Sequence, residues 1–435
     1  MLNYAASSVQ PLEGIDPRLD FSPDTAYVVV KTDPATTVVV TSDRRIIPWN
    51  ETDLMEQGII APTNYPLLLE PRWTSASVGD FQSGAAAPDA AGVHRQVRNY
   101  LQKYLGLRHP AEYDLIACWI MGSYLKPLFK CYPILSFNAP HESGKSRCLE
   151  AISQLALNGK WFGEITPAAF RRFTESKLTF CLDELKDIGL KNESPMITIL
   201  LNAYNGAEVA LADSVRGGGW LPVVFKVTSP VAMGNLREIK NEALKSRTIQ
   251  IRTQYDPSYK TAKLPGVFAS EPAQIRDGLY SWMLSDWRLI RDSYETYPQI
   301  PELSAREMDS YQPLLAIAAL VGPETVQALT GYAVADREEK SLAKKAVDDN
   351  LDLLQFLRDE LEARGLREAL PVIANRELAD AYGRTNNLRV NYKRFLGMIS
   401  ALHVVADIRN RHGGKYIVFN RSEIDRQLQL IEAKS

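Results

Sequence analysis

The stretch Tyr132-Pro-Ile-Leu-Ser-Phe-Asn-Ala139-Pro-His-Glu-Ser-Gly144-Lys145-Ser146 decides how the rest of the chain is interpreted. Its first seven residues form a short apolar run typical of a buried strand, and a helical pattern follows Ser146 to about residue 158. A strand that passes through a tight loop into a helix directs backbone N–H groups and the positive end of the helix dipole at one point. That point is suited to phosphate groups.

The end of this loop carries the three side chains that a nucleoside triphosphate requires. Gly144 gives the backbone freedom, Lys145 a cation for the β- and γ-phosphates, and Ser146 a hydroxyl for Mg²⁺. The Walker A pattern begins with glycine where this chain has alanine, and the alternative interpretation is an ordinary surface loop. We expect an ATP site formed by these three residues and the loop before them: Ala139, Pro140, His141, Glu142 and Ser143.

A second signal is an apolar strand that ends in two carboxylates. Residues 178–182 are followed by Asp183 and Glu184, 38 residues after Lys145. Nucleotide hydrolysis requires one carboxylate on Mg²⁺ and another that polarises the attacking water. We therefore expect Asp183 to hold the metal together with Ser146, and Glu184 to activate water. An acidic pair in a solvated loop is the alternative.

The order of elements predicts an α/β fold with several parts. Between residues 130 and 255, short apolar strands alternate with helical patterns, which indicates a mostly parallel sheet covered by helices. The predicted domains are a mixed α/β N-terminal domain over 1–90, a core with its preceding helices over 91–260, a helical lid with connecting helices over 261–365, and a C-terminal domain over 366–435.

Local patterns refine the N-terminal half. Two β-branched runs predict strands at 26–31 and 37–41. Residues 76–93 are rich in small residues and predict a linker. The apolar period then predicts helices over about 91–107 and 111–129. No functional motif is found in the N-terminal domain.

The last 70 residues have the pattern of a winged helix. Short helices are expected at 377–382 and 391–402, followed by a hairpin of residues 404–409 and 415–420 around a Gly-Gly turn. The segment 366–435 holds 12 Lys/Arg against 7 Asp/Glu, a net charge of +5, while the rest of the chain carries −7. This charge favours a contact with DNA over a contact with protein. The candidate DNA-binding side chains are Arg389, Lys393, Arg394, Arg411 and Lys415.

Residues 130–330 resemble an AAA+ ATPase, and in particular the minichromosome-maintenance-like and poxvirus-type replicative helicases of phages and mobile genetic elements. The resemblance implies an AAA+ P-loop core with a helical lid. It also implies that Asn235 is the sensor-1 residue and that Arg247 is an arginine finger reaching the neighbouring subunit. Arg306 corresponds to the sensor-2 arginine of the lid. A finger supplied in trans implies a ring of identical subunits, expected to be a hexamer.

The same resemblance gives a meaning to the segment between the acidic pair and Asn235. Two strand-like runs flank a triple-glycine tip, which predicts a hairpin over residues 207–227. In the resembled helicases such a hairpin grips single-stranded DNA in the channel of the ring. Arg216 is then expected to meet a phosphate and Trp220 to stack on a base. The alternative is a mobile surface hairpin with Trp220 in the core.

The sequence thus predicts a cytoplasmic ATPase that uses ATP and Mg²⁺ and translocates on or unwinds DNA, both single-stranded and duplex. Two alternatives stay open: an AAA+ switch or remodelling ATPase that unwinds nothing, and a scaffold without ATPase activity. The four cysteines are expected to be reduced core residues. We expect no membrane span, because the most apolar stretch, residues 115–125, has 11 residues where about 20 are needed.

Overall fold

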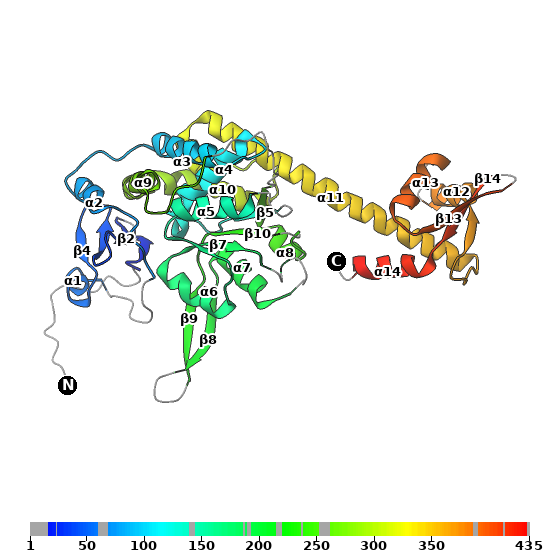
Figure 1. The fold of residues 1–435 in the computed structure, drawn as a ribbon, viewed down its shortest axis with the longest axis horizontal. Helices are drawn as coiled ribbons and strands as arrows, with labels where there is room; N and C mark the ends of the chain where they lie inside the picture. Colours follow the sequence, from blue (N-terminus) through cyan, green and yellow to red (C-terminus); the bar gives the residue numbers. More distant parts are fainter. Residues whose placement is uncertain are drawn as a thin grey trace. The chain divides into compact units, whose positions relative to one another are not determined.

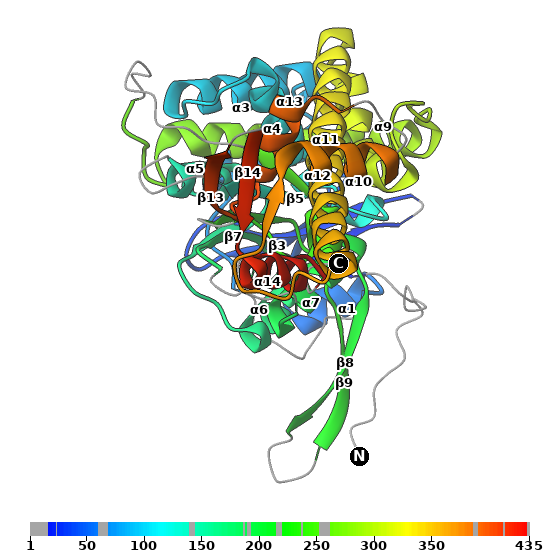
Figure 2. The ribbon, with the colours of Figure 1, turned by 90° about the vertical axis from the view of Figure 1, so that its right-hand side faces the viewer.

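The computed structural model divides the chain into two compact units, residues 1–336 and 337–435, each with its own hydrophobic core. Figures 1 and 2 show the elements of both units. The structure describes residues 16–22, 24–59, 68–138, 144–185, 188, 193–214, 220–235, 238–251, 262–385, 390–411 and 414–432.

A five-stranded parallel sheet lies at the centre of the first unit, which confirms the predicted α/β class. The strands stand in the order β11–β5–β10–β7–β6. In the register of the sheet, Asn235 pairs with Asn138 and Gly234 pairs with Asp183, so three strands end side by side. The strands are β5 (Ile134–Asn138), β6 (Gly159–Phe162), β7 (Thr179–Asp183), β10 (Val231–Asn235) and β11 (Thr248–Ile251).

Alternate side chains of these strands enter two different cores, one on each face of the sheet. Leu135 and Phe137 belong to the larger core, whereas Phe180 and Leu182 belong to the smaller one. Successive strand side chains point to opposite faces, so a strand covered on both faces is apolar along its whole length. The four cysteines are free and buried, as expected.

Helices cover both faces. The larger core is closed by helices from before and after the sheet: α3 (Ala90–Tyr104), α4 (Pro110–Ser123), α5 (Lys145–Leu155), α9 (Ser270–Thr296) and α10 (Ala305–Val321). The smaller core is closed by α6 (Pro167–Phe173), α7 (Pro195–Asn205) and α8 (Glu242–Lys245). Two 3₁₀ turns, η1 (Lys126–Leu128) and η2 (Thr174–Ser176), complete the connections.

The N-terminal segment forms an antiparallel sheet that shares the larger core. Val28 and Val30 face that core, while Val29 and Val39 face a small core of their own. The elements are β1 (Leu19–Phe21), β2 (Ala26–Lys31), β3 (Thr37–Thr41), β4 (Ile46–Pro48) and α1 (Glu51–Glu56), so the two predicted strands are confirmed.

The linker predicted over residues 76–93 was wrong for much of its length. Residues Ser75–Gln82 form helix α2, which Thr74 caps by accepting a hydrogen bond from the Ser77 N–H. Val78 and Phe81 are buried. Small residues are common in linkers, but here two apolar side chains three positions apart give the helix a face to bury.

An antiparallel hairpin leaves the first unit between the acidic strand and Asn235, as predicted. It consists of β8 (Glu208–Ser214) and β9 (Trp220–Lys226), paired from Glu208 with Lys226 to Ser214 with Trp220. In both views it extends away from the sheet and its helices (Figures 1 and 2).

The second unit contains the predicted pair of helices and the hairpin, together with two elements that the sequence pattern missed. Leu378, Phe395, Ile417 and Phe419 form its core with residues of the long helix α11 (Pro323–Ala363). The expected elements are α12 (Asn375–Thr385), α13 (Tyr392–Ala401), β13 (Val405–Arg411) and β14 (Gly414–Phe419); the additional ones are β12 (Val372–Ala374) and α14 (Arg421–Glu432).

No helix in the described part of the chain is both long and apolar enough to cross a membrane. The apolar stretch from residue 115 instead lies in α4 and the turn after it, where every residue up to 125 is buried.

Gly159 gives a test of the packing between α5 and the sheet. A β-carbon at this position would lie 2.3 Å from the carbonyl oxygen of Ser153, a backbone atom that has little room to move. Gly159→Ala should therefore lower the free energy of unfolding by about 1–3 kcal/mol in denaturant titrations. Gly163→Ala is the matched control, because a β-carbon there would meet no atom within 4 Å. Equal stability of the two variants would contradict this packing.

Candidate active site

The junction between β5 and α5 has the geometry of a phosphate-binding turn in its described part. Gly144 is the N-cap of α5 and has φ 87°, a left-handed conformation that favours glycine. Lys145 and Ser146 form the first turn, so their side chains stand at the positive end of the helix dipole. The predicted loop residues Ala139, Pro140, His141, Glu142 and Ser143 lie outside the described residues.

Lys145 interacts electrostatically with the two carboxylates at the end of β7. The lysine is only 7% exposed, and burial lowers the pKa of its ammonium group. The nearby carboxylates of Asp183 and Glu184 act in the opposite direction and favour the charged form. The structure therefore brings together a buried cation and two carboxylates that follow it by 38 and 39 residues in the sequence.

Gly234 lies between these groups and contributes no side chain of its own. It lies in β10, between the strands that lead to Lys145 and Asp183. A β-carbon on Gly234 would lie 3.4 Å from Asp183 Oδ1 and 3.6 Å from Lys145 Cβ. Residue 234 thus separates the two groups without a side chain between them. The sequence analysis missed it, although a glycine directly before a polar strand end was a usable signal.

Asn235, the next residue, has a buried amide with one unused side. Its side chain is 4% exposed, and its Oδ1 accepts a hydrogen bond from the Leu185 N–H at 3.2 Å. Its Nδ2 is buried and has no hydrogen-bond partner among the described residues. Because a buried donor without a partner is costly, this N–H₂ group fits an oxygen of a bound ligand.

Glu184 occupies a strained position beside these groups. Its φ is +52°, which costs a non-glycine residue roughly 1–2 kcal/mol. The conformation is fixed because the Glu184 N–H donates to the Gly234 carbonyl at 2.9 Å and the following N–H donates to Asn235. The side chain itself is exposed. Strain of this kind gathers at functional sites, where the structure holds a side chain in place.

The residues present fit ATP and Mg²⁺. The α5 N-terminus and Lys145 are suited to phosphate oxygens, and the hydroxyl of Ser146 and the carboxylate of Asp183 are hard oxygen ligands of the kind Mg²⁺ prefers. The described residues contain no cluster of three His, Cys, Asp or Glu side chains that holds a metal by itself. A site with two protein ligands depends on phosphate and water for the rest, which is usual for Mg²⁺.

Arg247 lies at the opposite edge of the sheet, where the strands have their amino ends. It directly precedes β11, whose first residue pairs with Ile134 at the start of β5. The length of β5, roughly 15 Å, therefore lies between Arg247 and the turn that carries Lys145. Its Nη1 donates to the Ala243 carbonyl at 2.6 Å, and its guanidinium lies 5.6 Å from the centre of the Tyr204 ring.

Arg306 is likewise placed away from Lys145. It is exposed in the first turn of α10. One turn later, the Ser310 hydroxyl lies 3.1 Å from the Tyr204 hydroxyl. Since Tyr204 also contacts Arg247, the start of α10 lies toward the same edge of the sheet as Arg247. The structure thus divides the predicted catalytic residues into two groups.

The candidate DNA-binding residues fall in two places. On the hairpin, Trp220 is the first residue of β9, at the end farthest from the sheet, and Arg216 lies outside the described residues. In the second unit, Arg389 also lies outside them. The exposed side chains of Lys393 and Arg394 begin α13. The wing strands contribute Arg411, at the end of β13, and Lys415, exposed on β14.

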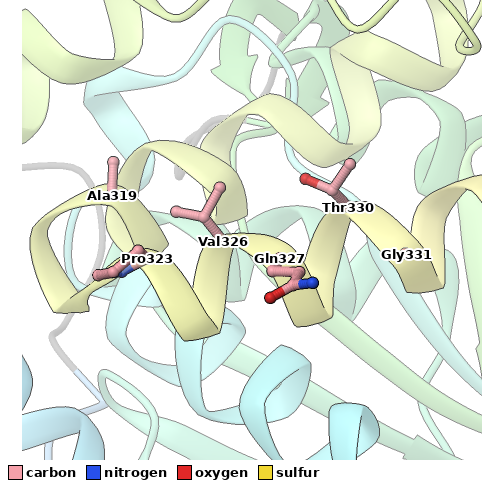
Figure 3. A pocket seen from close by; sticks show the side chains of 6 residues that line it. All are labelled: Ala319, Pro323, Val326, Gln327, Thr330 and Gly331. Atoms are coloured by element: carbon pink, nitrogen blue, oxygen red, sulfur yellow. The ribbon is translucent and has the colours of Figure 1, made fainter.

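A separate hollow lies on α10 and the first turns of α11 (Figure 3). None of its lining side chains is titratable, and none belongs to the predicted site, so it adds nothing to the chemistry above. The lining residues are Ala319, Pro323, Val326, Gln327, Thr330 and Gly331.

No family model and no curated protein match this chain. Among solved structures, an active helicase described as SCCmec type IV Cch is 11% identical with a TM-score of 0.39, over 91% of this chain and 79% of that one. The apo C-terminal region of NrS-1 is 12% identical with a TM-score of 0.30, over 90% and 96%. Cdc6p from Pyrobaculum aerophilum is 12% identical with a TM-score of 0.21, over 76% and 95%. Likenesses this distant carry no argument, so the interpretation of the site depends on its own residues.

The strain at Glu184 can be tested by stability alone. Glycine adopts φ +52° without steric cost, whereas alanine does not. Glu184→Gly should therefore be more stable than Glu184→Ala by up to about 1 kcal/mol, although glycine usually destabilises a folded chain. The measurement is the free energy of unfolding of both variants. A more stable alanine variant would show that residue 184 is not held in the left-handed region.

Proposed function

We propose that the chain is a ring-forming AAA+ ATPase that hydrolyses ATP with Mg²⁺ and moves on or unwinds DNA. One observation carries the proposal: the sheet register brings Lys145, Asp183, Glu184 and Asn235 to a single edge beside the N-terminus of α5. Each of these side chains has the charge or hydrogen-bonding capacity that phosphoryl transfer to water requires.

Each group has a defined task in this proposal. The α5 N-terminus and Lys145 bind the phosphates, and Ser146 and Asp183 hold Mg²⁺, which neutralises charge on the phosphate oxygens. Glu184 orients the attacking water and accepts its proton. The unused Nδ2 of Asn235 donates a hydrogen bond to that water or to a γ-phosphate oxygen, which supports its assignment as sensor 1.

The two arginines complete the site of a neighbouring subunit. Arg247 and Arg306 lie toward the edge of the sheet opposite Lys145, so neither is suited to the phosphates bound by its own chain. Contacts between unlike edges are head-to-tail and close into a ring when the rotation allows it. We propose a hexamer in which Arg247 is the trans-acting finger and Arg306 the sensor-2 residue.

Two parts of the chain are suited to DNA. The projecting hairpin, with Trp220 at the start of β9 and Arg216 in the sequence between its two strands, grips a single strand in the channel. The second unit acts as a winged helix whose α13 and wing meet duplex phosphates through Lys393, Arg394 and Lys415. A motor with these two contacts serves the replication of a phage or mobile element. A switch ATPase that binds DNA without unwinding it would lack the strand displacement expected here.

The active-site assignment is tested by three substitutions and their mixtures. Lys145→Ala should abolish turnover, because the phosphates lose a charge-assisted contact. Glu184→Gln should bind ATP but hydrolyse it slowly, and Arg247→Ala should also be slow with its own pocket intact. Mixed subunits of the last two should regain turnover, since some interfaces then join an intact Glu184 to an intact Arg247.

Steady-state ATPase assays over a range of mixing ratios provide the measurement. A mixture of Arg247→Ala with Lys145→Ala should recover in the same way and serves as the second pair. Absence of recovery at every ratio would rule out a finger acting in trans, and wild-type turnover by Lys145→Ala would rule out the site.

The second unit gives an independent prediction. Removing the exposed charges in Lys393→Ala/Arg394→Ala should weaken duplex binding and reduce the slope of log K against log salt by up to about 2, at ~0.9 per phosphate contact. Arg426→Ala is the matched control, because Arg426 is paired with Glu423 in the same unit. Salt titrations of duplex affinity measure the slope. If the double variant keeps the wild-type slope, this face serves protein contacts instead.

A further inference from the structure

Arg247 is supported on one side by an aromatic ring. Its guanidinium carbon lies 5.6 Å from the centre of the Tyr204 ring, and its Nη1 donates to the Ala243 carbonyl at 2.6 Å. No carboxylate of the described residues forms an ion pair with it. Contact with an aromatic face leaves the in-plane N–H groups of a guanidinium available, and these are the groups that bind phosphate.

Tyr204 itself is firmly held. Its side chain is 4% exposed, and its hydroxyl lies 3.1 Å from the Ser310 hydroxyl of α10. Its carbonyl accepts a hydrogen bond from the Tyr132 N–H at 2.9 Å, which joins the end of α7 to the segment before β5. Contacts with α10 and with the segment before β5 therefore hold this residue of α7, whereas Arg247 belongs to a short connection between α8 and β11.

Tyr204 is also neutral. Burial raises the pKa of its hydroxyl well above the usual value, so no phenolate forms near neutral pH. The contact with Arg247 is thus one between a cation and an uncharged ring. It holds the side chain without neutralising the charge that a phosphate would attract.

We propose that Tyr204 is a positioning residue for Arg247, holding its guanidinium ready for the nucleotide of the neighbouring subunit. This inference rests on the proposed function, since it requires Arg247 to act in trans. Tyr204 touches no substrate in this account. Its effect reaches the neighbouring phosphate only through Arg247, which makes the two residues separable by experiment.

The test is a double-mutant cycle in the full-length chain. Tyr204→Leu should slow ATP turnover by about 3- to 30-fold, the range expected for one cation–π contact. Tyr204→Phe keeps the ring and loses the hydroxyl contacts with Ser310 and Cys131, so it should stay within about twofold of wild type. In an Arg247→Ala background, Tyr204→Leu should cause no further loss, because the group it positions is already absent.

Two further readouts separate positioning from a general structural defect. Each variant should bind an ATP analogue as tightly as wild type, since the pocket around Lys145 lies at the other edge of the sheet. Mixtures of Tyr204→Leu with Glu184→Gln should regain turnover as mixtures containing Arg247→Ala do. Both results would place the defect at the edge of the sheet that carries Arg247.

Each contrary result has a defined meaning. Additive losses in the double variant, weakened analogue binding by Tyr204→Leu, or no recovery in its mixtures would overturn the role of Tyr204 while Arg247→Ala still behaved as a trans finger. Wild-type turnover by Arg247→Ala would instead overturn the proposed function, and the inference with it.

Discussion

The electrostatic interaction of the buried Lys145 with Asp183 and Glu184 is the one on which the site depends. Parallel strands end at a common edge, so the residues that follow β5 and end β7 and β10 come together there. Gly234 places no side chain between Lys145 and Asp183, and a β-carbon there would touch both, 3.6 Å from Lys145 Cβ and 3.4 Å from Asp183 Oδ1. The neighbouring Asn235 ends the strand between β5 and β7, with a buried Nδ2 that no described residue satisfies.

A second consequence follows from the direction of the strands. Groups at the carboxyl ends of the strands form the pocket. Groups at the amino ends, among them Arg247, are separated from the pocket by the length of β5 and cannot reach it. A single chain therefore carries one half of the proposed site at each edge. This arrangement is suited to a ring of subunits, where each interface joins unlike edges. Tyr204 belongs to the amino edge and lies in the last turn of α7, the helix that leads into the projecting hairpin.

Much of this was predictable where the signal is local. The strand before Lys145, the helix that begins at it, the acidic strand end and the hairpin strands are each specified by neighbouring residues. The position of Tyr204 beside Arg247 was not, because it arises from contacts between segments far apart in sequence, and Gly234 was missed although a glycine before a polar strand end is a local signal. Helix α2 was mistaken for a linker because its composition is small and polar, while burial of Val78 and Phe81 decides its structure. Strand β12 is three residues long, too short for an alternating pattern.

The most direct test of the central claim is the rate of ATP hydrolysis by the wild-type chain with Mg²⁺, measured with and without single-stranded DNA. The account predicts Mg²⁺-dependent turnover that rises when the DNA is added. The reason is that, along the chain, the hairpin comes between β7, which ends in Asp183, and β10, which ends in Asn235. Turnover that is absent at saturating ATP, or that does not respond to DNA at any concentration, would contradict it.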